Sequence, residues 1–168
     1  MSYHHINYEI DKKKYRDLFY NNIQEYGQWH WLCPKRQELF WYQLFVHDDH
    51  PLKPIIQDVE RDLNIYGMNN FPRFSYQFPN SRLEHHKDED EMVSININLL
   101  ETIPIIHLEN NPHAYQCALF DVGHVLHGVE PDPNPRLILK FCLRHDYEEV
   151  WERLDNFGLL TEDCILYV

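Results

Sequence analysis

The stretch LFDVGHVLHGVEPDPNPRLILKFCL, residues 119–143, places a histidine and an arginine on either side of a turn. His127 ends an apolar segment, a cluster of Pro, Asp and Asn residues follows, and Arg136 opens the next apolar run. Two apolar segments separated by these turn residues predict two strands joined as a hairpin. A histidine and an arginine across one hairpin can point into the same cavity, one toward a metal and the other toward an anion.

An arginine at a partly buried strand position is usually paired with a carboxylate, ideally one that accepts two hydrogen bonds from the guanidinium. Arg136 is therefore a candidate anion-binding residue. The alternative is an ion pair with a local acid such as Glu130.

The run RLILKFCL has one apolar face and one mixed face, because residues two apart on a strand share a face. The apolar face, which we expect to pack outward against N-terminal helices, comprises Leu137, Leu139, Phe141 and Leu143. Lys140 lies on the other face with Arg136. It either enters the cavity, where it could meet a substrate carboxylate, or extends from its mouth to solvent.

A second informative stretch is LEHHKDED, residues 83–90. A facial site of two histidines and one carboxylate leaves positions open on an iron ion. A His and an acid two apart on an extended segment reach one ion from the same face. His86 has Asp88 two positions on, whereas His85 has Lys87. The predicted pair is His86 and Asp88.

Another His-x-Asp triplet begins at His47, but Pro51 and a predicted helix follow at once. Its acids are more typical of a helix start than of a metal site. The second histidine ligand should come from a later strand, and the histidines available there are His107, His113, His124 and His127. The turn and Arg136 that follow it favour His127.

The rest of the chain alternates helical and extended patterns. Apolar spacing predicts helices within residues 10–26, 47–67 and 146–160. Residues 39–46 are either a buried strand or a helix end. Short β-rich segments at 71–78, 92–100, 103–108, 115–122 and 136–143 predict a sandwich or barrel.

Composition limits the class of protein. The 168 residues are 43% hydrophobic with a net charge of −12, which predicts one compact domain and argues against binding nucleic acid through its phosphates. No signal segment or spanning apolar run is evident, so we expect no membrane association. The cysteines form no CxxC motif and suggest buried, reduced thiols in a cytoplasmic protein; they are Cys33, Cys117, Cys142 and Cys164.

Taken together, His86-Lys87-Asp88, His127 and Arg136 nine positions later resemble the iron(II)/2-oxoglutarate-dependent oxygenase superfamily. The prolyl-hydroxylase branch is the most similar. Its tyrosine about ten residues before the first ligand matches Tyr76, and its last hairpin matches HGVEPDPNPR. The resemblance covers roughly residues 71–145, and Pro79-Asn80 replaces the glycine usually found after that tyrosine.

The resemblance implies an α+β protein with a double-stranded β-helix (jelly roll) core. Within a single domain of residues 1–168, residues 1–70 would form a helical support region packed on one sheet. Residues 71–145 would form the jelly roll, and residues 146–168 a C-terminal helix and tail.

The resemblance also implies roles for residues. His86, Asp88 and His127 would bind Fe(II), Arg136 would bind the distal carboxylate of 2-oxoglutarate, and Tyr76 would hydrogen-bond this cosubstrate. In SININLL, Ser94, Asn96 and Asn98 share a polar face that either lines the cavity or meets solvent. In the first case Asn98 would lie nearest the cosubstrate, and Asn96 and Lys140 would be candidate substrate-binding residues.

The implied activity is a dioxygenase that uses O2 and 2-oxoglutarate to hydroxylate a C–H bond and releases succinate and CO2. An amino acid or a peptidyl residue such as proline is the expected substrate. A carboxylate at Asp88, rather than a small residue, favours hydroxylation over halogenation. The alternatives are a jelly-roll metal-binding or sensor module without turnover, and an acidic structural protein. The sequence does not indicate an oligomeric state.

Overall fold

The computed structural model describes residues 2–26, 28–30, 41–89 and 92–162. Cys33, Cys164 and the expected C-terminal tail from residue 163 lie outside these ranges. Cys117 and Cys142 are buried, as expected from the sequence. Within the described ranges, no helix combines the length and the hydropathy needed to span a membrane.

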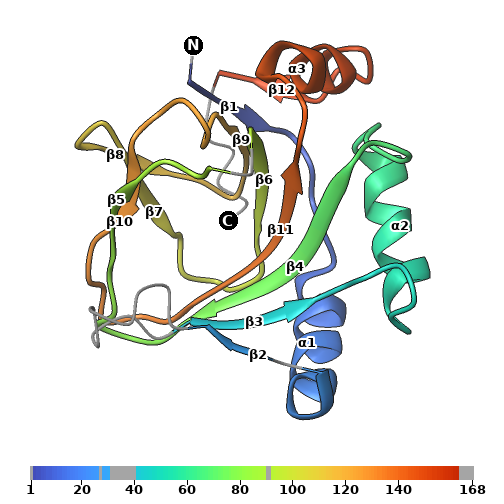
Figure 1. The fold of residues 1–168 in the computed structure, drawn as a ribbon, viewed down its shortest axis with the longest axis vertical. Helices are drawn as coiled ribbons and strands as arrows, with labels where there is room; N and C mark the ends of the chain where they lie inside the picture. Colours follow the sequence, from blue (N-terminus) through green and yellow to red (C-terminus); the bar gives the residue numbers. More distant parts are fainter. Residues whose placement is uncertain (1, 27, 31–40, 90–91, 163–168) are drawn as a thin grey trace.

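The described strands form two sheets whose neighbouring strands are all antiparallel. The large sheet has the order β12-β1-β9-β6-β11-β4-β3-β2, and the small sheet the order β5-β10-β7-β8. The small sheet faces one side of the large one (Figure 1). The strands are β1 Tyr3–Ile6, β2 Gln28–His30, β3 Trp41–Phe45, β4 Asn70–Gln77, β5 Leu83–His86, β6 Val93–Asn98, β7 Ile105–Leu108, β8 Asn111–Ala114, β9 Cys117–Phe120, β10 His127–Val129, β11 Arg136–Leu143 and β12 Leu160–Thr161.

The hairpin predicted around residues 130–135 is a crossover between the two sheets. His127 begins β10, which pairs with β5 and β7 in the small sheet. Arg136 begins β11, which pairs with β4 and β6 in the large sheet. Strand pairing depends on partners distant in the sequence, so the turn residues alone could not distinguish a crossover from a hairpin.

All three predicted helices are present. α1 (Lys12–Tyr26) and α2 (Lys53–Asp62) cover the outer face of the large sheet, and α3 (Tyr147–Asp155) lies at one end of the molecule beside β1 and β12 (Figure 1). The acids before α2 do not cap it, because the N-cap is Leu52 without a side-chain hydrogen bond. Asp48 instead pairs with the Lys53 ammonium at 3.3 Å.

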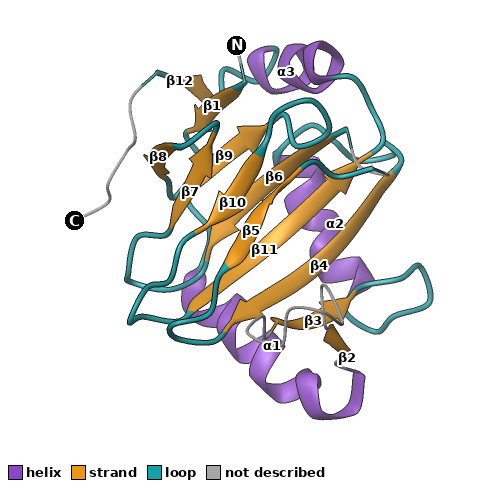
Figure 2. Ribbon diagram, turned by 60° about the vertical axis from the view of Figure 1, so that its left-hand side comes forward, coloured by secondary structure: helices purple, strands orange, loops and turns teal. Residues whose placement is uncertain are grey.

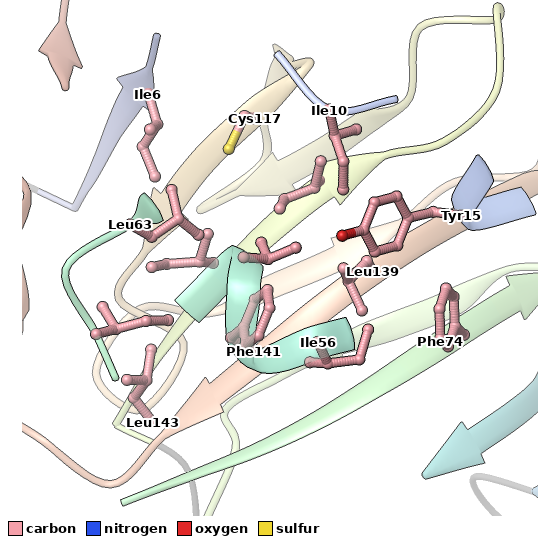
Figure 3. Packing of buried hydrophobic residues seen from close by; sticks show 14 of the residues in the cluster. Ile6, Ile10, Tyr15, Ile56, Leu63, Phe74, Cys117, Leu139, Phe141 and Leu143 are labelled. Carbon is pink, nitrogen blue, oxygen red and sulfur yellow. The ribbon is translucent and has the colours of Figure 1, made fainter. Parts of the chain in front are cut away.

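The main hydrophobic core lies between the large sheet and these helices (Figure 3). The predicted apolar face of β11 is fully buried in it, and so is the apolar face of β6. The helices contribute Tyr15, Phe19, Ile56 and Val59 to the same cluster. Each such side chain stabilises the fold by roughly 1.5–3 kcal/mol. With most of the apolar side chains on the outer face of the large sheet, its inner face can be polar.

The first 70 residues do more than support the fold with helices. β1 pairs with β9 and β12, and β3 pairs with β4, so this region extends the large sheet at both ends. The ambiguous segment 39–46 contains strand β3. Periodicity could not identify it because short apolar strands and helix ends have the same pattern.

Candidate metal centre and the cavity around it

The small sheet brings His86 and His127 together. The two residues are directly paired across β5 and β10, and their ring centroids lie 4.4 Å apart. Asp88 follows β5, and its backbone N–H donates to the carbonyl of Val122 at 3.0 Å. Strand pairing fixes the two rings, and this hydrogen bond fixes the turn that carries the carboxylate.

The three side chains converge on one point. Asp88 Oδ1 lies 3.0 Å from His86 Nε2, and Asp88 Oδ2 lies 3.7 Å from His127 Nε2. One donor atom from each residue lies within 4.8 Å of the other two. Two imidazoles and one carboxylate are the donor set of a facial iron(II) site, so these residues fit such an ion.

Hydrogen bonds to the backbone orient both rings. Nδ1 of His86 donates to the carbonyl of Glu84 at 2.8 Å, and Nδ1 of His127 to that of Val125 at 3.2 Å. A histidine that donates through Nδ1 presents Nε2 as its metal ligand. Both Nε2 atoms are the ones that face Asp88.

The electrostatics of the cluster suit a cation. Burial raises the pKa of Asp88, but the hydrogen bond to His86 and the charge of Lys140 outweigh it and hold this pKa well below its usual range. Burial lowers the pKa of His127 to about 4. The hydrogen bond to Asp88 raises the pKa of His86. At neutral pH the cluster therefore has an ionised carboxylate and a neutral His127.

His85 does not join the cluster. Its ring lies over Gly128 on the other face of the small sheet and makes an edge contact with His107, with ring centroids 6.2 Å apart. A Cβ on Gly128 would lie 2.9 Å from both the His85 ring and the carbonyl oxygen of Leu83. A side chain at Gly128 would therefore disturb the β5–β10 pairing that positions both histidines.

A cavity of about 750 Å³, including its open mouth, lies between the two sheets and contains the cluster. Figure 2 shows β5 and β10 in front of the strands of the large sheet that form the opposite wall. The wall is polar: Ser75, Gln77, Ser94 and Asn96 line it, and each is at least nine-tenths buried. One side-chain oxygen of each has no hydrogen-bond partner among the described residues. Buried polar atoms are rarely left unpaired, so this wall is suited to a polar ligand.

Arg136 lines the cavity with Tyr115, a residue that the sequence analysis did not single out. Burial lowers the pKa of the Arg136 guanidinium, which nevertheless stays protonated. Burial raises the pKa of Tyr115, while the charge of Arg136 and a side-chain hydrogen bond with Asn96 oppose this shift. A guanidinium and a phenol in this arrangement can bind one carboxylate. Tyr115 lies between β8 and β9, where no alternation pattern assigned it a face.

The expectation that Tyr76 would hydrogen-bond the cosubstrate is wrong. Tyr76 pairs with Leu137, on the outer face of the large sheet, and packs against the main core. Its ring stacks on Phe19 with centroids 6.2 Å apart, and it does not line the cavity. The neighbouring Gln77 pairs with Arg136 and faces inward. The spacing to His86 crosses a loop and therefore could not determine the face.

The expectation that Asn98 would lie nearest the cosubstrate is wrong as well. Asn98 lies on the same face as Asn96, but its amide N–H groups donate to the carbonyls of Leu100 at 2.8 Å and Thr102 at 3.0 Å. Asn98 thus stabilises the loop after β6 and is absent from the lining of the main cavity. Asn96 and Lys140 do line it, and the Lys140 ammonium lies 3.8 Å from Asp88 Oδ2.

Neither a protein-family model nor a curated protein sequence matches this chain. Solved structures do. A prolyl-4-hydroxylase from Pseudomonas putida aligns with a TM-score of 0.64 over 86% of this chain and 91% of that one, at 15% identity. This chain has the fold of the prolyl hydroxylases.

Two further prolyl hydroxylase structures have a similar fold. The viral collagen prolyl hydroxylase of Paramecium bursaria Chlorella virus-1, solved as a 2-oxoglutarate complex, aligns with a TM-score of 0.58 at 13% identity, over 84% of this chain and 95% of that one. A prolyl hydroxylase from Trichoplax adhaerens, solved with a hypoxia inducible factor peptide, gives 0.58 at 10% identity, over 88% and 84%. The resemblance to a prolyl-hydroxylase-like 2-oxoglutarate oxygenase, expected from the sequence, is thus confirmed as one of fold.

Proposed function

We propose that this protein is an iron(II)- and 2-oxoglutarate-dependent dioxygenase in which the whole chain forms one domain around a double-stranded β-helix. It hydroxylates a C–H bond of an amino acid or of a peptidyl residue such as proline, with release of succinate and CO2. The observation that carries this proposal is the joint placement of the His86–Asp88–His127 cluster and Arg136 in one cavity.

The residues present have distinct roles in this proposal. His86, Asp88 and His127 would hold Fe(II), which supplies the oxidative chemistry with O2 and 2-oxoglutarate. Arg136 and Tyr115 would bind the distal carboxylate of 2-oxoglutarate. Three protein ligands leave positions open for the cosubstrate and oxygen. The enclosing sheets exclude water from the bound cosubstrate.

The direct test is to measure succinate formed from 2-oxoglutarate by the purified chain, with Fe(II) and with an amino-acid and peptide mixture. We expect slow succinate formation without a substrate, and none when Fe(II) is omitted or replaced by Zn(II). Metal binding without any 2-oxoglutarate consumption would instead favour a metal-binding or sensor module.

Tyr115 lines the cavity and Tyr76 does not, which gives a testable prediction. Tyr115→Phe should raise the half-saturating 2-oxoglutarate concentration by between about tenfold and somewhat over 100-fold, because one hydrogen bond to a charged group is worth roughly 1.5–3 kcal/mol. Tyr76→Phe is the matched control and should leave this concentration unchanged, since Tyr76 lies on the outer face. An increase for Tyr76→Phe and none for Tyr115→Phe would contradict the assignment.

A further inference from the structure

One short segment supports two of the three proposed metal ligands through its backbone. Residues 121–126 connect β9 of the large sheet to β10 of the small sheet. The carbonyl of Val122 accepts a hydrogen bond from the backbone N–H of Asp88 at 3.0 Å. The carbonyl of Val125 accepts one from Nδ1 of His127 at 3.2 Å. The conformation of this segment therefore helps to set the position of the carboxylate and the orientation of the imidazole.

Asp121 closes this segment into a turn. Its Oδ1 accepts a hydrogen bond from the backbone N–H of His124 at 3.2 Å and another from Nδ1 of the same residue at 2.9 Å. Its carbonyl accepts the N–H of Val125 at 3.1 Å. The N-cap residue of a helix stabilises the first turn in the same way. Because the carbonyls of Val122 and Val125 belong to the closed turn, their directions depend on Asp121.

Two further backbone hydrogen bonds hold the turn against the rest of the protein. The N–H of Asp121 donates to the carbonyl of Ser2 at 3.0 Å. The N–H of Gly123 donates to the carbonyl of Met92 at 3.1 Å. The Asp121 side chain is 15% exposed, whereas that of His124 is 63% exposed. The turn is therefore held in place, and little water competes for the Asp121 carboxylate.

We propose that Asp121 is a positioning residue of the metal centre, which acts through the two carbonyls of this turn. The proposal rests on the proposed function, in which Asp88 and His127 bind Fe(II). Hydrogen-bond partners that orient metal ligands contribute to metal affinity, and their loss typically lowers it by about 10–100-fold. His124, which the sequence suggested as a candidate ligand, instead belongs to the turn. Because its imidazole is exposed, its backbone N–H is the more important contact.

The test is a titration of the metal-free full chain and its variants with Mn(II), a redox-stable probe. Asp121→Ala should bind Mn(II) about 10–100-fold more weakly than the unmodified chain. Asp121→Asn keeps an acceptor oxygen and is an equally good cap, so its affinity should stay within about threefold. His124→Ala keeps the backbone N–H and should also stay within about threefold.

Asp11→Ala is the matched control for a loss of turn stability alone. At the start of α1, Oδ1 of Asp11 accepts the N–H of Lys14 at 3.0 Å, and its carbonyl accepts the N–H of Tyr15 at 3.2 Å. Both alanine variants should lower the thermal unfolding midpoint of the metal-free chain. Only Asp121→Ala should weaken Mn(II) binding at a temperature where both are folded. The visible spectrum of bound Co(II), which reports ligand geometry, should likewise change only in Asp121→Ala.

Unchanged Mn(II) affinity in Asp121→Ala would overturn the positioning role, and so would an equal loss in Asp11→Ala or in Asp121→Asn. If Asp121→Ala does not fold, Asp121→Gly takes its place as a better tolerated cap and should bind Mn(II) more weakly than Asp121→Asn. In each case Mn(II) binding by the unmodified chain would leave the proposed function standing. An unmodified chain that neither binds Mn(II) nor consumes 2-oxoglutarate would reject the function itself.

Discussion

His127→Ala is expected to abolish metal binding and, with it, all 2-oxoglutarate consumption. His127 supplies one of three donor groups, its side chain is buried, and its Nε2 faces Asp88. Loss of outer-shell partners alone typically costs 10–100-fold in metal affinity, so loss of a ligand should cost more than about 100-fold. Anaerobic titration with Fe(II), or with Mn(II) as a redox-stable probe, measures this affinity. His86→Ala should behave in the same way.

His85→Ala is the matched control for both histidine variants. It removes an adjacent imidazole from the same strand, but this ring lies over Gly128 on the opposite face of the sheet. Metal affinity should stay within about threefold of the unmodified chain, a range that small packing changes explain. Equal losses in His85→Ala and His86→Ala would show that the two rings are not on different faces, and the site would have to be reassigned.

Arg136→Ala is expected to raise the half-saturating 2-oxoglutarate concentration strongly while the metal remains bound. Truncating one partner of a buried, hydrogen-bonded charge pair costs roughly 2–5 kcal/mol. At tenfold per 1.4 kcal/mol this is an increase between about 30-fold and a few thousandfold. The 2-oxoglutarate requirement and the metal affinity can be changed separately, because Arg136 starts a strand of the other sheet, opposite the metal ligands.

The matched control here is Arg144→Ala, which removes an exposed arginine just after the same strand. Arg144 lies over the Phe71 ring and does not line the cavity. Its 2-oxoglutarate requirement should equal that of the unmodified chain. An unchanged requirement in Arg136→Ala, with normal metal binding, would show that Arg136 is a structural cation. The carboxylate site would then have to lie elsewhere.

Much of the fold could be predicted because its signals are local. The three helices show apolar spacing of three to four residues, and RLILKFCL shows a period of two. The apolar face of that strand is indeed fully buried against the helices. The strands of the N-terminal region were harder to predict, because a short apolar segment such as 39–46 has no distinguishing period.

The two corrected site residues were misassigned for different reasons. Tyr76 and Asn98 were assigned by resemblance and by position along a strand. Whether Tyr76 faces the cavity depends on the register between β4 and β11, in which Gln77 and not Tyr76 pairs with Arg136. Asn98 has the expected face, but loop carbonyls from Leu100 and Thr102 accept its hydrogen bonds. Register depends on residues distant in the sequence, whereas the Asn98 contacts depend on how the next few residues turn back, which the two-residue period of a strand does not specify.

The sequence by itself determined relations within single strands: the parity that groups His86 with Asp88 and sets His85 apart, and the two faces of β11. These follow from the two-residue period of an extended chain. Only the tertiary structure decided which strands share a sheet, and therefore that His127 and Arg136 face each other from different sheets. It also brought Tyr115 beside Arg136. Such contacts depend on long-range pairing and burial, which no local pattern specifies.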